Sequence, residues 1–160
     1  MKGITLTEPW ASLMAIDEKG IETRGWRTSY RGPIAIHAAK GFPSWALEAC
    51  WDEPFYSVLR KHDIIIEKDG RRFIADHKGK IVAVGELTAV ERTETFLRMS
   101  QGLRKHEIEF GDYAPGRYGF VIQRVRRLVE PVPCRGALSL WDIPPDVLAQ
   151  VQAQIGRGGV

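Results

Sequence analysis

The chain has 160 residues, 44% of them hydrophobic, a net charge of +3 and a pI near 9.0. This length and composition predict one compact domain with its own core and leave too little chain for a second. The 2 cysteines lie far apart, the 4 histidines lack helical pairing, and no run of about 18 apolar residues occurs. We therefore expect no disulfide scaffold, no metal, no cofactor and no contact with a membrane.

The segment 5–38 holds more charged and planar side chains than a fold requires. Thr7 is a suitable N-cap and Pro9 fits a first helical turn, so we expect a helix over residues 8–18. Gly20 is expected to end this helix. Trp10 lies on its apolar face, where packing into the core is the favoured interpretation.

An alternating segment follows the predicted helix. Its period of two places Glu22, Arg24 and Trp26 on one face, with Lys19 at the corner beside them. Exposed ion pairs contribute only ~0–1 kcal/mol, which gives little reason to concentrate them here. A structural lattice of charges and a recognition site both stay open as interpretations of these residues.

The rest of the chain predicts short strands mixed with short helices. Residues 34–38 are apolar on both faces, as in a buried strand, and His37 is expected to be a hydrogen-bonded core histidine. Further strands are expected over 80–90, with a bulge at Gly85, and over 117–129 and 139–143. Residues 64–66 and 73–74 predict a hairpin around the Asp-Gly pair at 69–70. One helix is expected to begin at residue 44, and another is expected after a break at residue 54. Further helices are expected over 96–103 and from residue 145, and a flexible tail is expected over 156–160.

Several segments resemble a known family, and they bracket nearly the whole chain in the family's order. The resemblance is carried by residues 9–13, 19–24, 26, 30–32, 36–38, 111–120, 131–136 and 140–141. These segments resemble the ASCH domain, the activating signal cointegrator homology family of the PUA-like superfamily. The resemblance implies an α+β fold over residues 1–155: a PUA-like β-barrel of about five or six strands flanked by short helices.

The resemblance also implies a function that involves nucleic acid or a nucleoside. The binding interpretation is a basic, aromatic-edged cleft for RNA, single-stranded more than double-stranded, or for a nucleoside-type small molecule. Phosphates and bases would be contacted by Arg24, Trp26, Tyr30, Arg31, Lys40, Arg117 and Tyr118.

The alternative is a small metal-independent hydrolase, of the 4-acetylcytidine amidohydrolase type or a ribonuclease. Lys19 matches the active-site lysine of the amidohydrolases, but Glu22 stands where they have a threonine. A glutamate cannot act as a hydroxyl nucleophile, so Glu22 would serve as general base for water. Glu107 is the first choice for the third member, with Glu109 and Glu94 as alternatives.

The sequence predicts a cellular location for the protein but no oligomeric state. Free thiols and the absence of a charged-then-apolar leader predict a cytoplasmic protein. Phosphate-loop, serine-elbow and dinucleotide fingerprints are absent from the sequence. The oligomeric state is not specified by any of these patterns.

Overall fold

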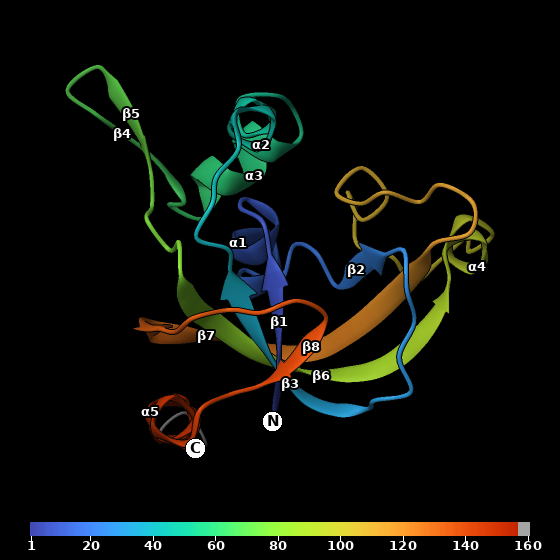
Figure 1. Cartoon of the computed structure of the whole chain (residues 1–160). Helices are drawn as coiled ribbons and strands as arrows, with labels where there is room; N and C mark the ends of the chain where they lie inside the picture. Colours follow the sequence, from blue (N-terminus) through green and yellow to red (C-terminus); the bar gives the residue numbers. More distant parts are fainter. Residues whose placement is uncertain (157–160) are drawn as a thin grey trace.

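The computed structural model describes residues 1–156, and its centre is a curled, six-stranded sheet (Figure 1). The strand order is β2-β7-β6-β3-β1-β8, and β1 and β3 form its parallel pair. The strands are β1 (Lys2–Leu6), β2 (Ile21–Arg24), β3 (Gly32–Ala38), β6 (Lys80–Arg92), β7 (Tyr118–Pro133) and β8 (Leu140–Asp142). The curled sheet and its short helices confirm the predicted α+β, barrel-like fold.

Within residues 1–156, five helices and one hairpin surround this sheet. The helices are α1 (Trp10–Ala15), α2 (Ser44–Ala49), α3 (Phe55–Lys61), α4 (Thr93–Leu97) and α5 (Pro145–Gly156). The hairpin β4 (Ile65–Lys68) and β5 (Arg71–Ile74) projects from the barrel next to α3, as Figure 1 shows. The predicted helix break at residue 54, the hairpin and the C-terminal helix are all confirmed.

The core is divided between the two faces of the sheet. On one face, Ala11 and Met14 of α1 pack against Ile34, Ile36 and Phe120 from the strands. On the other face, α5 lies against the outer side of the sheet (Figure 1). A third cluster joins Leu13 of α1 to α3, the hairpin and Phe110. The helix α1 therefore packs against two clusters, which holds the segment that follows it.

The ends of α1 differ from the sequence prediction. The helix is six residues long, its N-cap is Pro9, and no side chain caps it, so Thr7 does not act as predicted. The chain leaves the helix through Asp17, which has a φ of 60°, and not through Gly20. Aspartate tolerates this left-handed conformation better than most residues. The N–H groups of Glu18 and Lys19 then donate to the Leu13 carbonyl at 3.1 and 3.2 Å.

Three further boundaries differ from the prediction, and one strand was missed. Strand β1 was not expected, although Ile4 and Leu6 alternate with polar neighbours and are buried. The predicted helix through residue 103 ends at Leu97, and β7 continues past residue 129. Gly156 lies in α5, whereas residues 157–160 of the predicted tail lie outside the described residues. The bulge is confirmed, because the register shifts between Val84 and Glu86.

Candidate functional site

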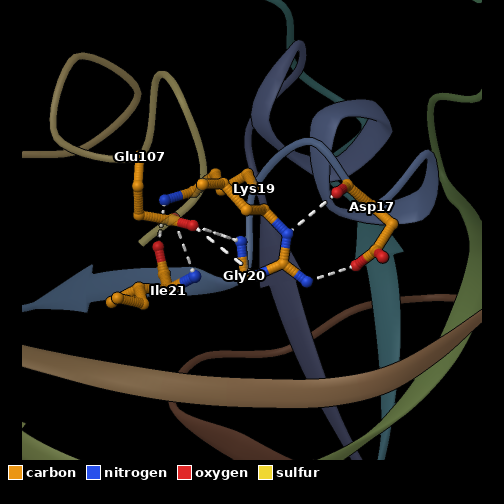
Figure 2. Close-up of polar contacts among 6 residues, drawn as sticks. Asp17, Lys19, Gly20, Ile21 and Glu107 are labelled. Atoms are coloured by element: carbon orange, nitrogen blue, oxygen red, sulfur yellow. Dashed lines mark hydrogen bonds and ion pairs between the residues drawn. The ribbon is translucent and has the colours of Figure 1, made fainter. Parts of the chain in front are cut away.

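Lys19 lies at the predicted corner between α1 and β2, but it is fully buried. Its ammonium donates a hydrogen bond to the carbonyl of Ile21, as Figure 2 shows. Burial disfavours the charged form and lowers the Lys19 pKa, while Glu22 and Glu107 oppose this shift through their negative charges. Lys19 is thus a buried side chain that feels the charges of two carboxylates, and it is not an exposed surface residue.

Glu107 comes from the segment between α4 and β7, and it is 1% exposed. Its carboxylate accepts the Gly20 N–H at 3.0 and 3.1 Å and the Ile21 N–H at 2.9 Å (Figure 2). Of the three glutamates considered from the sequence, it is therefore the one that holds the corner next to Lys19. Glu94 instead accepts the Gly116 N–H at 3.0 Å, and exposed Glu109 bonds His106 at 3.0 Å.

Arg104 closes the corner from outside. Its Nε donates to the Asp17 carbonyl at 2.8 Å, and its Nη1 lies 3.7 Å from Glu107 Oε2. A side chain at Gly20 would meet this guanidinium, since a Cβ there would lie 1.9 Å from Nη1. Gly20 is therefore needed for the close approach of Arg104 and not for ending the helix.

A cleft of about 500 Å³ lies on the Glu22 side of this corner. Its aromatic lining includes Trp10 of α1 and Trp45 of α2, whose ring centroids are 5.6 Å apart at 40°. Trp45 is 60% exposed, which is unusual for a tryptophan and leaves much of its ring surface open to solvent. The remaining lining residues are Thr5, Leu6, Thr7, Glu22, Thr23, Arg24, Glu109, Phe110, Gly111, Asp112 and Arg117.

The charged groups of this cleft carry both signs. Arg24 donates to the Thr5 carbonyl at 2.7 Å, and Arg117 donates to the Asp112 and Thr23 carbonyls at 3.2 and 3.3 Å. Glu22, Glu109 and Asp112 line the same space. The Glu22 carboxylate accepts the Thr23 N–H at 2.9 Å, which leaves its second oxygen available. The cleft is therefore a polar surface with donors and acceptors, in which carboxylates lie beside the basic groups that the sequence predicted.

The structure does not gather the other predicted contact residues around the same cleft. Lys40 lines a separate cavity of about 1120 Å³. Trp26 packs edge-to-face on Phe120 at 5.0 Å, and Tyr30 donates to the Pro33 carbonyl at 2.5 Å. The remaining two are Arg31, bonded to the Thr28 and Tyr30 carbonyls, and Tyr118, which lies under the Arg27 guanidinium. Of the seven predicted contact residues, the cleft takes in Arg24 and Arg117.

Sequence reasoning missed Trp45 and Asp112 as residues of the cleft. Trp45 lies in α2, the helix that was expected from residue 44. Its exposure depends on how α2 packs against α1, which a helical period does not specify. His37 is as predicted: its ring bonds Thr5 Oγ1 at 3.2 Å and the Cys134 carbonyl at 2.7 Å, and it is 2% exposed.

Residues 1–156 contain no group of three or more His, Cys, Asp or Glu side chains arranged for a metal ion. No helix within the same range has the length and apolar character needed to cross a membrane.

The fold and the corner define a small barrel domain of the PUA-like type. The sequence model of the ASCH domain matches residues 4–129, and the chain belongs to the ASCH domain family. This confirms the resemblance found in the sequence. Membership supports an RNA-binding or hydrolase-like role in general terms.

Solved structures agree with the family assignment at the level of the fold. The ASCH protein of Zymomonas mobilis has 12% identity and a TM-score of 0.53, and the alignment covers 95% of this chain and 93% of that one. A mutant form of the same Zymomonas mobilis protein gives 13% identity, a TM-score of 0.53 and coverage of 95% and 96%. A search among curated proteins found no matching sequence.

Proposed function

We propose that the cleft binds one base of a single-stranded RNA, or a modified nucleoside. The observation that carries this proposal is the exposed face of Trp45 beside Trp10, in a cleft that also holds Glu22 and Arg24. Bases outside a duplex are recognised by stacking on aromatic rings and by hydrogen bonds to their edges. A base edge carries both donors and acceptors, which suits a surface with both carboxylates and guanidinium groups.

The charges of the cleft favour a base over a phosphate. Glu22, Glu109 and Asp112 contribute negative charge, and the two arginines already donate to protein carbonyls. A phosphate would meet carboxylates in this space and would have to compete for engaged cations. We therefore expect binding of a nucleoside to depend little on salt.

A titration with nucleosides, followed by tryptophan fluorescence, tests this proposal. Trp45→Ala should weaken binding by about ten-fold, because stacking on an aromatic ring contributes ~1–3 kcal/mol per base. Trp51→Ala is the matched control, since Trp51 is 37% exposed and packs near Tyr56 instead. Equal affinity for wild type and Trp45→Ala would refute binding at this cleft.

Hydrolysis of an acylated nucleoside or of RNA is the second candidate, and the position of Glu22 favours it. Glu22 lines the cleft and lies close enough to Lys19 to influence its pKa. Glu22 would take a proton from water, while buried Lys19 would position the carboxylate and not contact the substrate. A chromatographic assay with 4-acetylcytidine tests this: turnover by wild type that Glu22→Gln abolishes supports it, and no turnover by wild type leaves the binding function.

We place this function in the cytoplasm. Both Cys50 and Cys134 are free thiols, as expected for a reducing compartment. Fractionation of cells that express the protein would test the location.

A further inference from the structure

The hairpin β4–β5 presents two faces of different chemistry. Cross-strand pairs in its register are Ile65 with Ile74, Ile66 with Phe73, Glu67 with Arg72, and Lys68 with Arg71. Because side chains alternate along a strand, each face receives every second pair. One face therefore carries Ile65, Ile74, Glu67 and Arg72, and the other carries Ile66, Phe73, Lys68 and Arg71.

The first face attaches the hairpin to the body of the protein. Ile65 is buried in the cluster that includes α3, and Glu67 accepts a hydrogen bond from Tyr56 of that helix. Arg60 and Arg72 contact the Glu67 carboxylate at 3.2 and 3.0 Å. Arg72 also lies 5.1 Å from the centre of the Tyr56 ring. The orientation of the hairpin on α3 is thus determined by buried Ile65 and one polar network.

The second face has no such partner within the described residues. Phe73 is 49% exposed and Ile66 is 44% exposed, and both Lys68 and Arg71 are exposed. The two-residue turn adds Asp69, whose carboxylate lies at the tip. An exposed aromatic ring therefore lies in line with two cations, on an arm that extends beyond the barrel (Figure 1).

The turn makes this arrangement well defined. Asp69 and Gly70 have φ values of 53° and 72°, as a type I′ turn requires at both central positions. This turn fixes the register, so Lys68 pairs directly with Arg71 and lies on the same face as Ile66 and Phe73. Residues two apart on a strand are separated by about 7 Å, which places each cation one position beyond the apolar pair.

We propose that this outer face of the hairpin binds a single strand of RNA, separately from the cleft. Phe73, supported by Ile66, would stack on one base, while Lys68 and Arg71 would contact the adjoining phosphates. Charge complementarity selects a polyanion, and the exposed ring selects bases that are not paired in a duplex. The choice of RNA over DNA rests on the function proposed for the cleft; the stacking surface itself does not.

Binding of a fluorescent oligonucleotide, measured by anisotropy at several salt concentrations, tests this proposal. Lys68→Gln with Arg71→Gln should reduce the slope of log affinity against log salt by about 1.4, since each phosphate contact on a single strand contributes roughly 0.7. Phe73→Ala should weaken binding by about ten-fold at constant salt, and Phe73→Tyr should restore it. DNA of the same sequence is the second probe, and equal affinity for it would overturn the choice of RNA.

Matched controls lie near α4, on another part of the barrel. Arg98→Gln with Lys105→Gln removes the same charge from exposed positions, and Leu97→Ala removes a side chain that is 53% exposed. These variants should bind the oligonucleotide as wild type does. The proposal is overturned if they weaken binding as much as the hairpin variants do. It is also overturned if Phe73→Leu binds like wild type, because the face would then take an apolar partner and not a base.

Different measurements would refute the cleft proposal and the hairpin proposal. The hairpin variants should leave the affinity for a free nucleoside unchanged, because a nucleoside has no phosphate and its base occupies the cleft. Unchanged nucleoside binding in Trp45→Ala, together with weaker oligonucleotide binding in the hairpin variants, would support the hairpin alone. An unchanged oligonucleotide affinity in every hairpin variant would overturn the hairpin and leave the cleft proposal intact.

Discussion

A buried carboxylate lies at each end of α1, and the two are surrounded by different partners. Glu8, just before the helix, is 2% exposed and accepts hydrogen bonds from the Ser12 hydroxyl at 3.0 Å and the Ser12 N–H at 3.3 Å. Glu107, beyond the other end, is 1% exposed and accepts backbone N–H groups of Gly20 and Ile21. Lys19 and Arg104 supply positive charge next to Glu107.

The comparison shows that the partners decide what a buried carboxyl group does. Burial raises the pKa of Glu8 to about 7, the hydrogen bonds from Ser12 only partly oppose this, and the charge of Asp76 adds to it. Glu8 is thus an internal acid that titrates near neutral pH. The Glu107 carboxylate accepts backbone hydrogen bonds, and so it joins the segment between α4 and β7 to the start of β2.

The largest effect on stability is expected from removing the Glu107 carboxylate. Glu107→Ala should destabilise the protein by about 3–5 kcal/mol, because it leaves the buried N–H groups of Gly20 and Ile21 without an acceptor and removes a negative charge that favours the buried Lys19 ammonium. For a chain of this size that corresponds to a fall in melting temperature of roughly 10 °C. Glu109→Ala is the control, since that side chain is 55% exposed and its loss should change stability by no more than about 0.5 kcal/mol. Similar melting temperatures for both variants would contradict this structural role of Glu107.

The second largest effect is a pH dependence of stability, and it comes from Glu8 at the other end of α1. The Glu8 pKa rises from 4.5 to about 7 on folding, so the folded state binds the extra proton, and stability falls as pH rises through this window. Between pH 5 and pH 8 the loss, measured by urea denaturation, should be about 2–3 kcal/mol. Glu8→Gln should remove this dependence and stabilise the protein at pH 8.

His77, at the same end of α1, makes stability depend on pH in the opposite direction to Glu8. Its Nδ1 lies 3.3 Å from Ser12 Oγ, and burial, then the charges of Arg127 and Lys80, lower its pKa. Its contribution to stability is therefore lost as pH falls below the ordinary histidine value of 6.5. His77→Gln in the Glu8→Gln background should flatten the acid side of the profile. An unchanged acid side would show that His77 does not titrate with folding.

A third test measures the interaction between Lys19 and Glu107. In a double-mutant cycle with Lys19→Met and Glu107→Gln, we expect a coupling energy of about 1–3 kcal/mol, because both side chains bond Ile21 and so belong to one hydrogen-bond network. The cycle is measured by urea denaturation at pH 7. Additivity within about 0.5 kcal/mol would mean that Glu107 acts on the backbone N–H groups alone.

The smallest effect on stability is expected at Glu22, which lines the cleft. Glu22→Gln retains a carbonyl oxygen for the Thr23 N–H, so the free energy of unfolding should change by no more than about 1 kcal/mol. Binding of a nucleoside should still weaken, because the cleft loses an acceptor with negative charge. Thermal melting and the fluorescence titration on the same sample check both statements. A large loss of stability would place Glu22 with Glu107 as a structural group.

Local features of this fold could be predicted from the sequence. The Asp-Gly pair predicted the hairpin because both residues tolerate positive φ, and the observed angles agree. Alternation predicted β2, and the isolated glycine in β6 marked a bulge. The family resemblance predicted the barrel, and the family match confirms it. Each of these local signals lies within a few residues of the feature that it specifies.

The site depended on contacts that no local pattern contains. Glu107 reaches Gly20 across 87 positions, and His77 reaches Ser12 across 65. The choice of Glu107 among three glutamates could therefore only be ranked from the sequence, and the exposure of Lys19 was judged wrongly because its charge suggested the surface. The sequence by itself determined most of the elements, with β1 as the exception, since φ/ψ preferences and periodicity act over a few residues. Tertiary packing decided which charges are buried and which face the cleft, because burial depends on segments that meet only when the sheet curls.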